Sequence, residues 1–423
     1  MSQPIPPRES RRFDIVLWGA TGFTGKLVAE VLAKRGPKEG IVWALAGRSR
    51  DKLEAVRAAI AGESPRVKDL PLLLGDSSDR GSLDLLAREA RVILTTVGPY
   101  SLYGRELVAA CAAAGTDYVD LAGETTFIRD MIDQHHAHAK ETGARIVHAC
   151  GYDSIPSDLG TLVLQTHMRE AHGGRCREVR CYAGESKGGV SGGTVASMLN
   201  FVKEATRDPR VRKIAGNPYA LDPDRKGRGP DGPDPRGVHF DADLGRWTGP
   251  FIMAASNSRV VRRSNALLGY AYGEDFRYSE AMSFGAGPKG MVMAAAVMGG
   301  LAGFAAGLML PPVRALLERT VLPAPGDGPS REKRDAGYFT TRLLGTGESA
   351  TGSPVKLLAT VKGTHDPGYG ETSSMIAESA LSLARDGKAI GQDGGVLTPA
   401  SCMGMTLVGR LRRAGMTFDV AER

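Results

Sequence analysis

The chain has 423 residues, of which 42% are hydrophobic and 24% are charged. These values are those of a folded globular protein that is too long for one ordinary core. The net charge is +7, but the basic residues are spread out and only 6% of residues are aromatic, which disfavours nucleic-acid binding. An anionic cofactor, an acyl carrier or a membrane surface is a partner that would suit the positive charge.

The first 25 residues contain the most informative motif. Residues 1–12 lack an apolar core, so we expect a flexible N-terminal tail and not a signal peptide. The run DIVLW at 14–18 predicts a buried strand, and Gly19, Gly22 and Gly25 follow it with G-x-x-G-x-x-G spacing. Thr24 is predicted to cap the next helix. A strand, a glycine turn and a helix are typical of a dinucleotide-binding element, where a pyrophosphate sits on the helix start.

The next predicted strand, 41–46, is followed by Gly47, Arg48 and Ser49. A site for NAD usually has an acidic residue here, which accepts a hydrogen bond from the ribose 2′-hydroxyl. Arg48 suits the 2′-phosphate of NADP instead, through charge-assisted hydrogen bonds. The sequence therefore favours NADP(H) over NAD, and the alternative is a surface arginine after a buried strand.

The first 150 residues alternate between strand and helix signals. Predicted helices cover 51–60, 80–89, 104–114 and 124–141, and further strands cover 70–74, 92–97, 118–120 and 145–149. This order predicts a doubly wound parallel sheet, an NADP-binding Rossmann domain over 13–150, with its ligand at the carboxyl ends of the strands. The strand ends add four expected cofactor-binding residues, Asp76, Thr96, Gly98 and Pro99.

Hydride transfer also needs a proton donor near the nicotinamide. Tyr100 and Tyr103 follow the fourth strand and Tyr152 follows the sixth, so these three are candidate catalytic residues, although packing roles are equally open for the first two. Asp120 and Glu124 follow the fifth strand at the same edge. Candidate substrate residues are Asp153, Ser154 and Tyr369. No metal site is expected, because His135 and His138 lack an obvious acidic third ligand.

Residues 151–365 are less regular and predict an inserted α+β domain for substrate binding or dimerisation. They include a breaker-rich stretch, 222–237, that is expected to be a surface loop or disordered, and an apolar segment, 291–313, without a charge. The segment is long enough to cross a bilayer, yet its glycines and alanines favour a buried or interface helix, with a membrane-surface or re-entrant segment and a true span as alternatives. Helices in 366–423 are expected to return to the Rossmann domain.

The motifs GATGFTG, AGRS, VGPYxxYG, DLAGE, GYDSIPSDLG, DPGYGETS and GGVLTPA occur in this order. In them the chain resembles the saccharopine dehydrogenase-like oxidoreductases, and most of all the branch that contains the trans-acting enoyl reductases of complex-lipid assembly. The resemblance implies a Rossmann domain with an inserted substrate domain, and it identifies Arg48 as the 2′-phosphate ligand but no catalytic residue. It gives the phosphate loop as Gly19, Thr21, Gly22, Phe23, Thr24 and Gly25.

The same resemblance implies NADPH-dependent reduction of an enoyl double bond on a polyketide or fatty-acyl chain that a partner synthase carries. Two alternatives remain: a saccharopine-type amino-acid or imine dehydrogenase, and a non-catalytic NADPH-binding protein at a lipid surface. The apolar segment favours a lipid-like substrate over saccharopine. Five cysteines without a C-x-x-C motif predict a reduced, cytoplasmic protein. A homodimer and peripheral association with the inner face of the membrane are further hypotheses.

Overall fold

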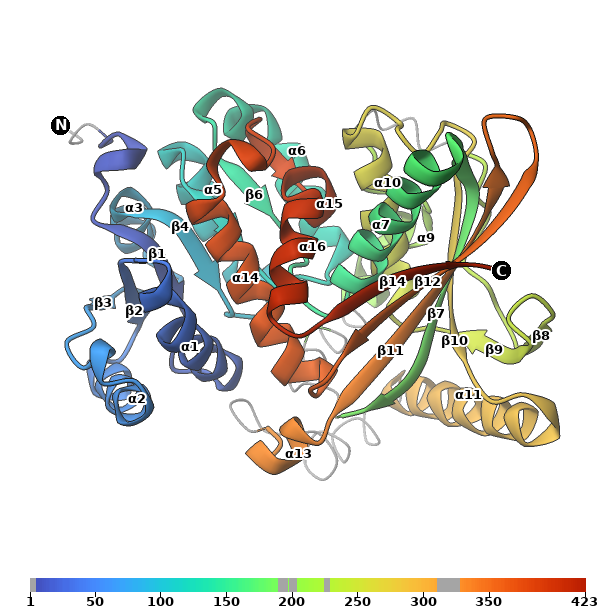
Figure 1. The fold of residues 1–423 in the computed structure, drawn as a ribbon. Coiled ribbons are helices and arrows are strands. Elements are labelled where there is room, and N and C mark those ends of the chain that lie inside the picture. Colours follow the sequence, from blue (N-terminus) through green and yellow to red (C-terminus); the bar gives the residue numbers. More distant parts are fainter. Residues whose placement is uncertain (1–4, 189–196, 198–203, 224–228, 310–327) are drawn as a thin grey trace. The chain divides into compact units, whose positions relative to one another are not determined.

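The structure is a computed structural model that describes residues 5–423 except 189–196, 198–203, 224–228 and 310–327. The chain divides into two compact units (Figure 1). The first unit comprises Met1–Ile155 and Tyr369–Ala414, and the second comprises Pro156–Gly368 and Gly415–Arg423. The second unit is therefore largely an insertion in the first.

The first unit contains a seven-stranded sheet in which every pair of neighbouring strands is parallel. Its order is β13-β6-β5-β4-β1-β2-β3. The strands are β1 (Phe13–Trp18), β2 (Trp43–Gly47), β3 (Leu72–Leu74), β4 (Ala90–Thr95), β5 (Asp117–Val119), β6 (Arg145–Val147) and β13 (Gly395–Leu397). All six residues of β1 are buried, because helices cover both faces of a parallel sheet and favour a continuous apolar run. The predicted doubly wound fold is confirmed.

Two groups of helices cover this sheet (Figure 1). In one group α1 packs on α14 and α14 packs on α16, and in the other α3 packs on α5 and α5 on α6. Both α14 and α3 contact the central strand β4. The helices of the first unit are α1 (Phe23–Arg35), α2 (Arg50–Glu63), α3 (Arg80–Glu89), α4 (Tyr100–Tyr103), α5 (Arg105–Ala114), α6 (Thr125–Thr142), α14 (Thr372–Arg385), α15 (Pro399–Cys402) and α16 (Gly404–Arg413).

The C-terminal segment differs from its prediction in two respects. The helix expected over 399–413 is divided into α15 and α16, because Gly404 has a φ of 52° and interrupts the helical backbone. Residues 415–423 do not remain with the first unit as expected for the whole of 366–423. They contain β14 (Thr417–Glu422), which pairs with a strand of the second unit.

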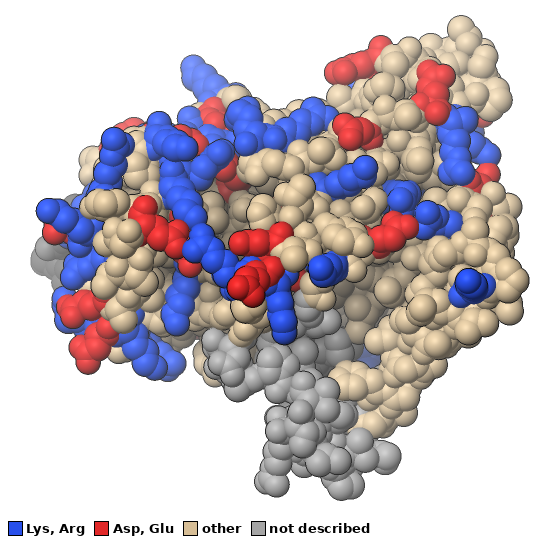
Figure 2. Space-filling view, turned by 60° about the horizontal axis from the view of Figure 1, so that its bottom comes forward, with Lys and Arg blue, Asp and Glu red and all other residues tan. Residues whose placement is uncertain are grey.

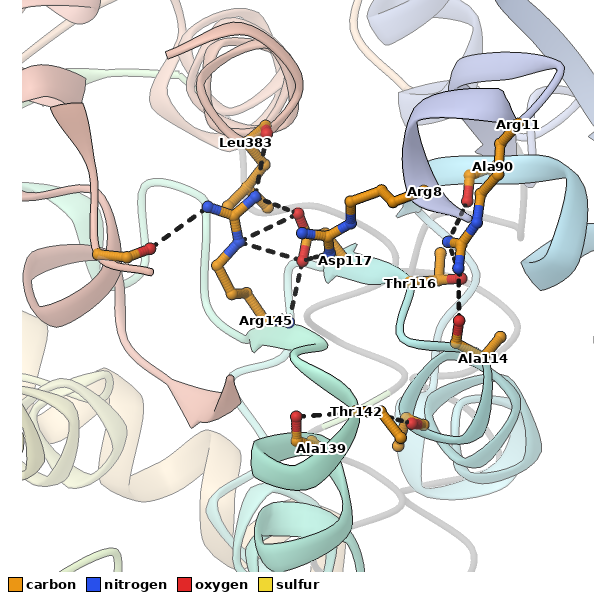
Figure 3. A network of polar contacts seen from close by, with 12 residues as sticks. Arg8, Arg11, Ala90, Ala114, Thr116, Asp117, Ala139, Thr142, Arg145 and Leu383 are labelled. Carbon is orange, nitrogen blue, oxygen red and sulfur yellow. Dashed lines mark hydrogen bonds and ion pairs between the residues drawn. The ribbon is translucent and has the colours of Figure 1, made fainter. Parts of the chain in front are cut away.

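The N-terminal segment is held against the first unit by two arginines (Figure 3). Arg8 forms an ion pair with the buried carboxylate of Asp117. Arg11 donates hydrogen bonds to the carbonyl oxygen of Ala90, at 2.9 Å, and to the hydroxyl of Thr116, at 2.7 Å. The prediction of a flexible tail over 1–12 is therefore wrong from Arg8 onward, since its arginines satisfy acceptors that are distant in sequence.

The second unit contains a mixed seven-stranded sheet of order β14-β12-β11-β7-β10-β9-β8. Only β7 and β10 are parallel; the other pairs are antiparallel. The remaining strands are β7 (Arg175–Lys187), β8 (His239–Asp241), β9 (Arg246–Pro250), β10 (Arg277–Ser283), β11 (Tyr338–Glu348) and β12 (Pro354–Gly363). Its helices in the described residues include α7 (Ile155–His172), α9 (Pro209–Gly216), α10 (Ala254–Leu267), α11 (Gly287–Met309) and α13 (Arg331–Asp335).

The apolar segment forms most of α11, which lies beside β9, while residues 310–313 are outside the described part of the chain. Met291, Val292, Met293 and Leu301 are exposed on it. Figure 2 shows a surface with few charged residues in this region. None of the helices that the structure describes is both long enough and apolar enough to span a bilayer. The favoured prediction is a buried or interface helix, and these exposed side chains disagree with its buried form only.

Candidate cofactor and active site

The turn between β1 and α1 forms a phosphate-binding loop. Gly19 has a φ of 87°, and its carbonyl oxygen accepts a hydrogen bond of 3.1 Å from the Gly22 N–H. The helix begins at Phe23, and no side chain caps it at Gly22. The prediction that Thr24 caps this helix is wrong, because Thr24 already lies in the first turn. An uncapped helix start in this position suits an anionic ligand, which takes the place of the cap.

The glycines of this loop allow contacts that no other residue would permit. A Cβ atom on Gly25 would lie 2.1 Å from the Gly19 carbonyl oxygen, and one on Gly19 would lie 2.5 Å from a methyl carbon of Val97. Thr96, which follows β4, donates from its hydroxyl to the Gly19 carbonyl oxygen at 3.3 Å. The backbone therefore forms a narrow cradle at the sheet edge, which fits the pyrophosphate of a dinucleotide.

Arg48 and Asp76 lie at the ends of neighbouring strands, β2 and β3. Arg48 is exposed. The pKa of Asp76 is lowered, mainly by a hydrogen bond from the Ser78 hydroxyl and in part by the positive charge of Arg48. An exposed guanidinium in this position is free to meet an anionic group of a bound cofactor. Both residues occupy the edge predicted for cofactor binding.

Glu124 fixes the loop after β4, which contains Gly98 and Pro99. Its carboxylate oxygens accept hydrogen bonds from the backbone N–H groups of Tyr100, at 2.8 Å, and Ser101, at 2.9 Å. This arrangement holds the start of α4 at the sheet edge. The sequence placed Glu124 at this edge, but its role was not predicted, because the donors belong to another loop.

The candidate donors Tyr100 and Tyr103 occupy different environments. Tyr100 is 5% exposed, and its hydroxyl donates to the Thr95 carbonyl oxygen at 3.4 Å and accepts from the Leu121 N–H at 3.1 Å. Burial raises the pKa of Tyr100 well above its ordinary value. Tyr103 is 46% exposed. Tyr100 thus connects the loops after β4 and β5, whichever further role it has.

Asp120 connects the loops after β5 and β6. One carboxylate oxygen accepts from the N–H groups of Ala122, at 2.9 Å, and Ala149, at 3.1 Å. The other accepts from the Tyr118 hydroxyl at 2.9 Å and lies 2.7 Å from Nδ1 of His148. With four partners and no exposed surface, Asp120 is a structural carboxylate that shapes this edge of the sheet.

The turn after β6 contains three predicted site residues. The Tyr152 N–H donates to the hydroxyl of Thr372, in α14, at 3.1 Å, and Ser154 is buried. Asp153 keeps partial solvent access, and burial alone raises its pKa to about 6. A Cβ atom on Gly151 would lie 2.7 Å from a methyl carbon of Leu121, so the turn packs closely on the loop after β5.

Tyr369, the third candidate substrate residue, packs on the phosphate loop. Its ring meets that of Phe23 edge-to-face, with centroids 4.7 Å apart, and the residue is 3% exposed. Its carbonyl oxygen accepts from the Ser373 hydroxyl at 2.6 Å. The returning segment of the chain therefore supports the cofactor loop.

A parallel sheet with this glycine cradle and an arginine after the second strand defines an NADP-dependent oxidoreductase. The family model of the saccharopine dehydrogenase NADP binding domain matches residues 15–147. The cofactor is NADP(H), as predicted.

The full chain also has close relatives. A relative from Mycobacterium tuberculosis (strain ATCC 25618 / H37Rv) is 47% identical over 421 residues, which cover 97% of this chain and 98% of that protein. The trans-acting enoyl reductase of Mycobacterium bovis (strain BCG / Pasteur 1173P2) is 45% identical over 425 residues with the same coverage. The chain belongs to the trans-acting enoyl reductase family of saccharopine dehydrogenase-like oxidoreductases.

A solved structure shows the same fold. The saccharopine dehydrogenase (L-Glu forming) of Saccharomyces cerevisiae has a TM-score of 0.57 and 12% identity, and the match covers 97% of this chain and 100% of that one. At this identity the likeness concerns the fold alone.

Proposed function

We propose that the protein reduces the α,β double bond of a polyketide or fatty-acyl thioester that a partner synthase carries. The observation that carries this proposal is the 45% identity to a trans-acting enoyl reductase along almost the whole of both chains. The cofactor, when bound, supplies the hydride. The residues of the sheet edge bind and orient it, and one of them provides a proton.

The roles follow from the positions of the residues. The cradle of Gly19, Gly22 and Gly25 would hold the pyrophosphate, and Arg48 would hold the 2′-phosphate. The loops after β4, β5 and β6 are joined by Glu124 and by buried hydrogen bonds, so they would present a rigid surface to the nicotinamide. Further predicted contacts with the cofactor are Thr21, Phe23, Thr24, Asp76, Thr96, Gly98 and Pro99. Predicted contacts with the substrate or the reacting atoms are Tyr100, Tyr103, Tyr152, Asp153, Ser154 and Tyr369.

The exposed apolar residues of α11, Met291, Val292, Met293 and Leu301, support a lipid-like substrate or a lipid surface as the environment of this helix. Peripheral membrane association and a homodimer remain predictions. A sedimentation assay with anionic vesicles and a molar-mass measurement would test them.

The experiment for the proposed function has two stages. Fluorescence titration first measures whether purified protein binds NADPH. NADPH consumption is then followed with 2-enoyl thioesters, both free and on a carrier domain, and with amino-acid or imine substrates of the saccharopine type. We expect turnover with enoyl thioesters only. Turnover with the charged substrates alone would establish the saccharopine-type alternative, and tight NADPH binding without any turnover would favour the non-catalytic one.

A further inference from the structure

The turn Gly151–Ser154 contains Asp153 and lies at the edge of the sheet that also carries the phosphate-binding loop. In the sheet, β6 lies next to β5, then β4, then β1, and all are parallel. The carboxyl ends of these strands therefore share an edge, and Asp153 lies on the same edge as Gly19 and Gly98. This is the edge on which reacting groups are found in open α/β folds.

The turn is held in place from both sides. The N–H of Ala149 is bonded to Asp120, the N–H of Tyr152 is bonded to Thr372, and the N–H of Ser154 donates to the Gly151 carbonyl oxygen at 3.2 Å. Ala149 has a φ of 61°, in the left-handed region that a residue with a Cβ rarely adopts. Such strain costs about 1–3 kcal/mol and is concentrated at functional sites. One residue of the segment that leads into the turn is therefore strained.

The carboxyl group of Asp153 differs from the other acids of this edge. Asp120 has four partners, and Glu124 accepts two backbone hydrogen bonds. In the part of the chain that the structure describes, no hydrogen bond or ion pair reaches the carboxyl group of Asp153, and no neighbouring charge contributes to its raised pKa. The group is therefore available to a ligand, and its raised pKa keeps it protonated to a higher pH than an ordinary aspartate.

Two of the candidate tyrosines, Tyr100 and Tyr103, are weaker candidates for proton transfer. Efficient general acids have a pKa near the working pH. Burial raises the pKa of Tyr100 and so moves it further from neutral pH. Its hydroxyl also forms hydrogen bonds with the Thr95 carbonyl oxygen and the Leu121 N–H. Tyr103 is largely exposed.

We propose that Asp153 is the proton donor of the reduction, a step that rests on the proposed function. After the β-carbon has gained a hydride, the acyl enolate uses its electron pair to form a C–H bond at the α-carbon with the proton of the Asp153 carboxylic acid. The O–H bond of Asp153 breaks, and the residue is left as a carboxylate. A proton from water then restores the acid, through the side of the residue that keeps solvent access.

The test compares Asp153→Asn with Asp69→Asn, whose side chain is 86% exposed in the same unit. Asparagine keeps the size of the side chain but cannot donate a carboxylic proton. We expect kcat with an enoyl thioester to fall about 100-fold or more, with NADPH affinity within twofold of the parent chain. The pH profile of kcat, which should fall above about pH 6 in the parent because the acid form is lost, should flatten in the variant. The Asp69→Asn variant should behave as the parent.

Asp153→Glu provides a second variant, which should retain a pH-dependent but reduced kcat. Infrared spectroscopy of the cofactor-free protein adds a readout apart from turnover: the parent should lose a carboxylic acid C=O band as the pH rises through about 6, and Asp153→Asn should lack that band. A parent that binds NADPH but reduces no enoyl thioester would overturn the proposed function, and this step with it. A working parent whose Asp153→Asn variant keeps its kcat and pH profile would overturn the role of Asp153 alone.

Discussion

The buried Glu280 should make the stability of the second unit depend on pH. Glu280 lies in β10 and is 2% exposed. The Tyr278 hydroxyl donates to one carboxylate oxygen at 2.6 Å, and the Asn257 side-chain amide donates to the other at 3.0 Å. Burial raises the pKa of Glu280 to about 7 in spite of these hydrogen bonds, with a small contribution from the negative charge of Asp234. The folded state therefore prefers the protonated form.

The sign and size of the effect follow from this pKa. The ordinary pKa of a glutamate is 4.5, and that of Glu280 in the folded state is about 7. At 1.36 kcal/mol per unit, the total effect is about 3 kcal/mol. Because the pKa is raised on folding, this stability is fully present below about pH 4.5 and is lost as the pH rises to about 7. Between pH 5 and pH 8 the expected loss is about 2–3 kcal/mol.

The substitution Glu280→Gln should remove this loss. Its amide can donate to the Tyr278 oxygen and accept from Asn257, which is the pattern of the protonated acid. Urea unfolding at pH 5 and pH 8, followed by tryptophan fluorescence, gives the free energy of unfolding, with Glu178→Gln in the neighbouring strand, 43% exposed, as the control for a lost charge. We expect the variant to exceed the parent by about 2–3 kcal/mol more at pH 8 than at pH 5. An equal effect at both pH values would refute the reasoning.

Three further substitutions test the first unit. Arg48→Asp should weaken binding of NADPH by about 100-fold and binding of NADH by much less, because it places a like charge beside the 2′-phosphate. Equal losses of affinity for the two cofactors in parallel titrations would contradict the role of Arg48 as the 2′-phosphate ligand. Gly25→Ala should reduce NADPH affinity more than tenfold, since its Cβ would meet a carbonyl oxygen at 2.1 Å, whereas Gly62→Ala, with open space around it, should leave affinity unchanged. Arg11→Ala should lower the free energy of unfolding by about 2 kcal/mol and Arg12→Ala by about 1 kcal/mol or less; similar values for both would argue against an anchored N-terminus.

The parallel sheet could be predicted because its signals are local. The run at β1 is buried on both faces and is apolar apart from Asp14, and the helix α3 covers the predicted range, 80–89. The predicted start of α1 is too late, because Thr24 and Gly22 are both common at the N-cap and only the structure shows that Gly22 occupies it.

The second sheet could not be derived in the same way. Its strand β14, at 417–422, pairs with β12, at 354–363, and β7 pairs with β10 across about a hundred residues of chain. The local hydrophobic pattern of a strand does not specify which distant strand it pairs with. The contacts of the stretch 222–237 were equally hard to predict, because its composition is that of a loop. In the structure Asp231 forms an ion pair with Arg262, and Asp234 forms one with Arg259; both arginines are buried in α10.

The candidate site shows the same limit. Position alone placed Asp120, Glu124 and Asp153 at one edge, because each follows a predicted strand. Their roles depend on which backbone N–H groups the neighbouring loops bring within reach. Asp120 and Glu124 receive such donors and hold the loops together. Asp153 receives none, and a carboxyl group that is partly desolvated without compensation is unfavourable for folding. Burial without a partner also raises the pKa of Asp153 to about 6, where a carboxylic acid can donate a proton. The burial that lowers stability is therefore the property that the proposed proton transfer requires.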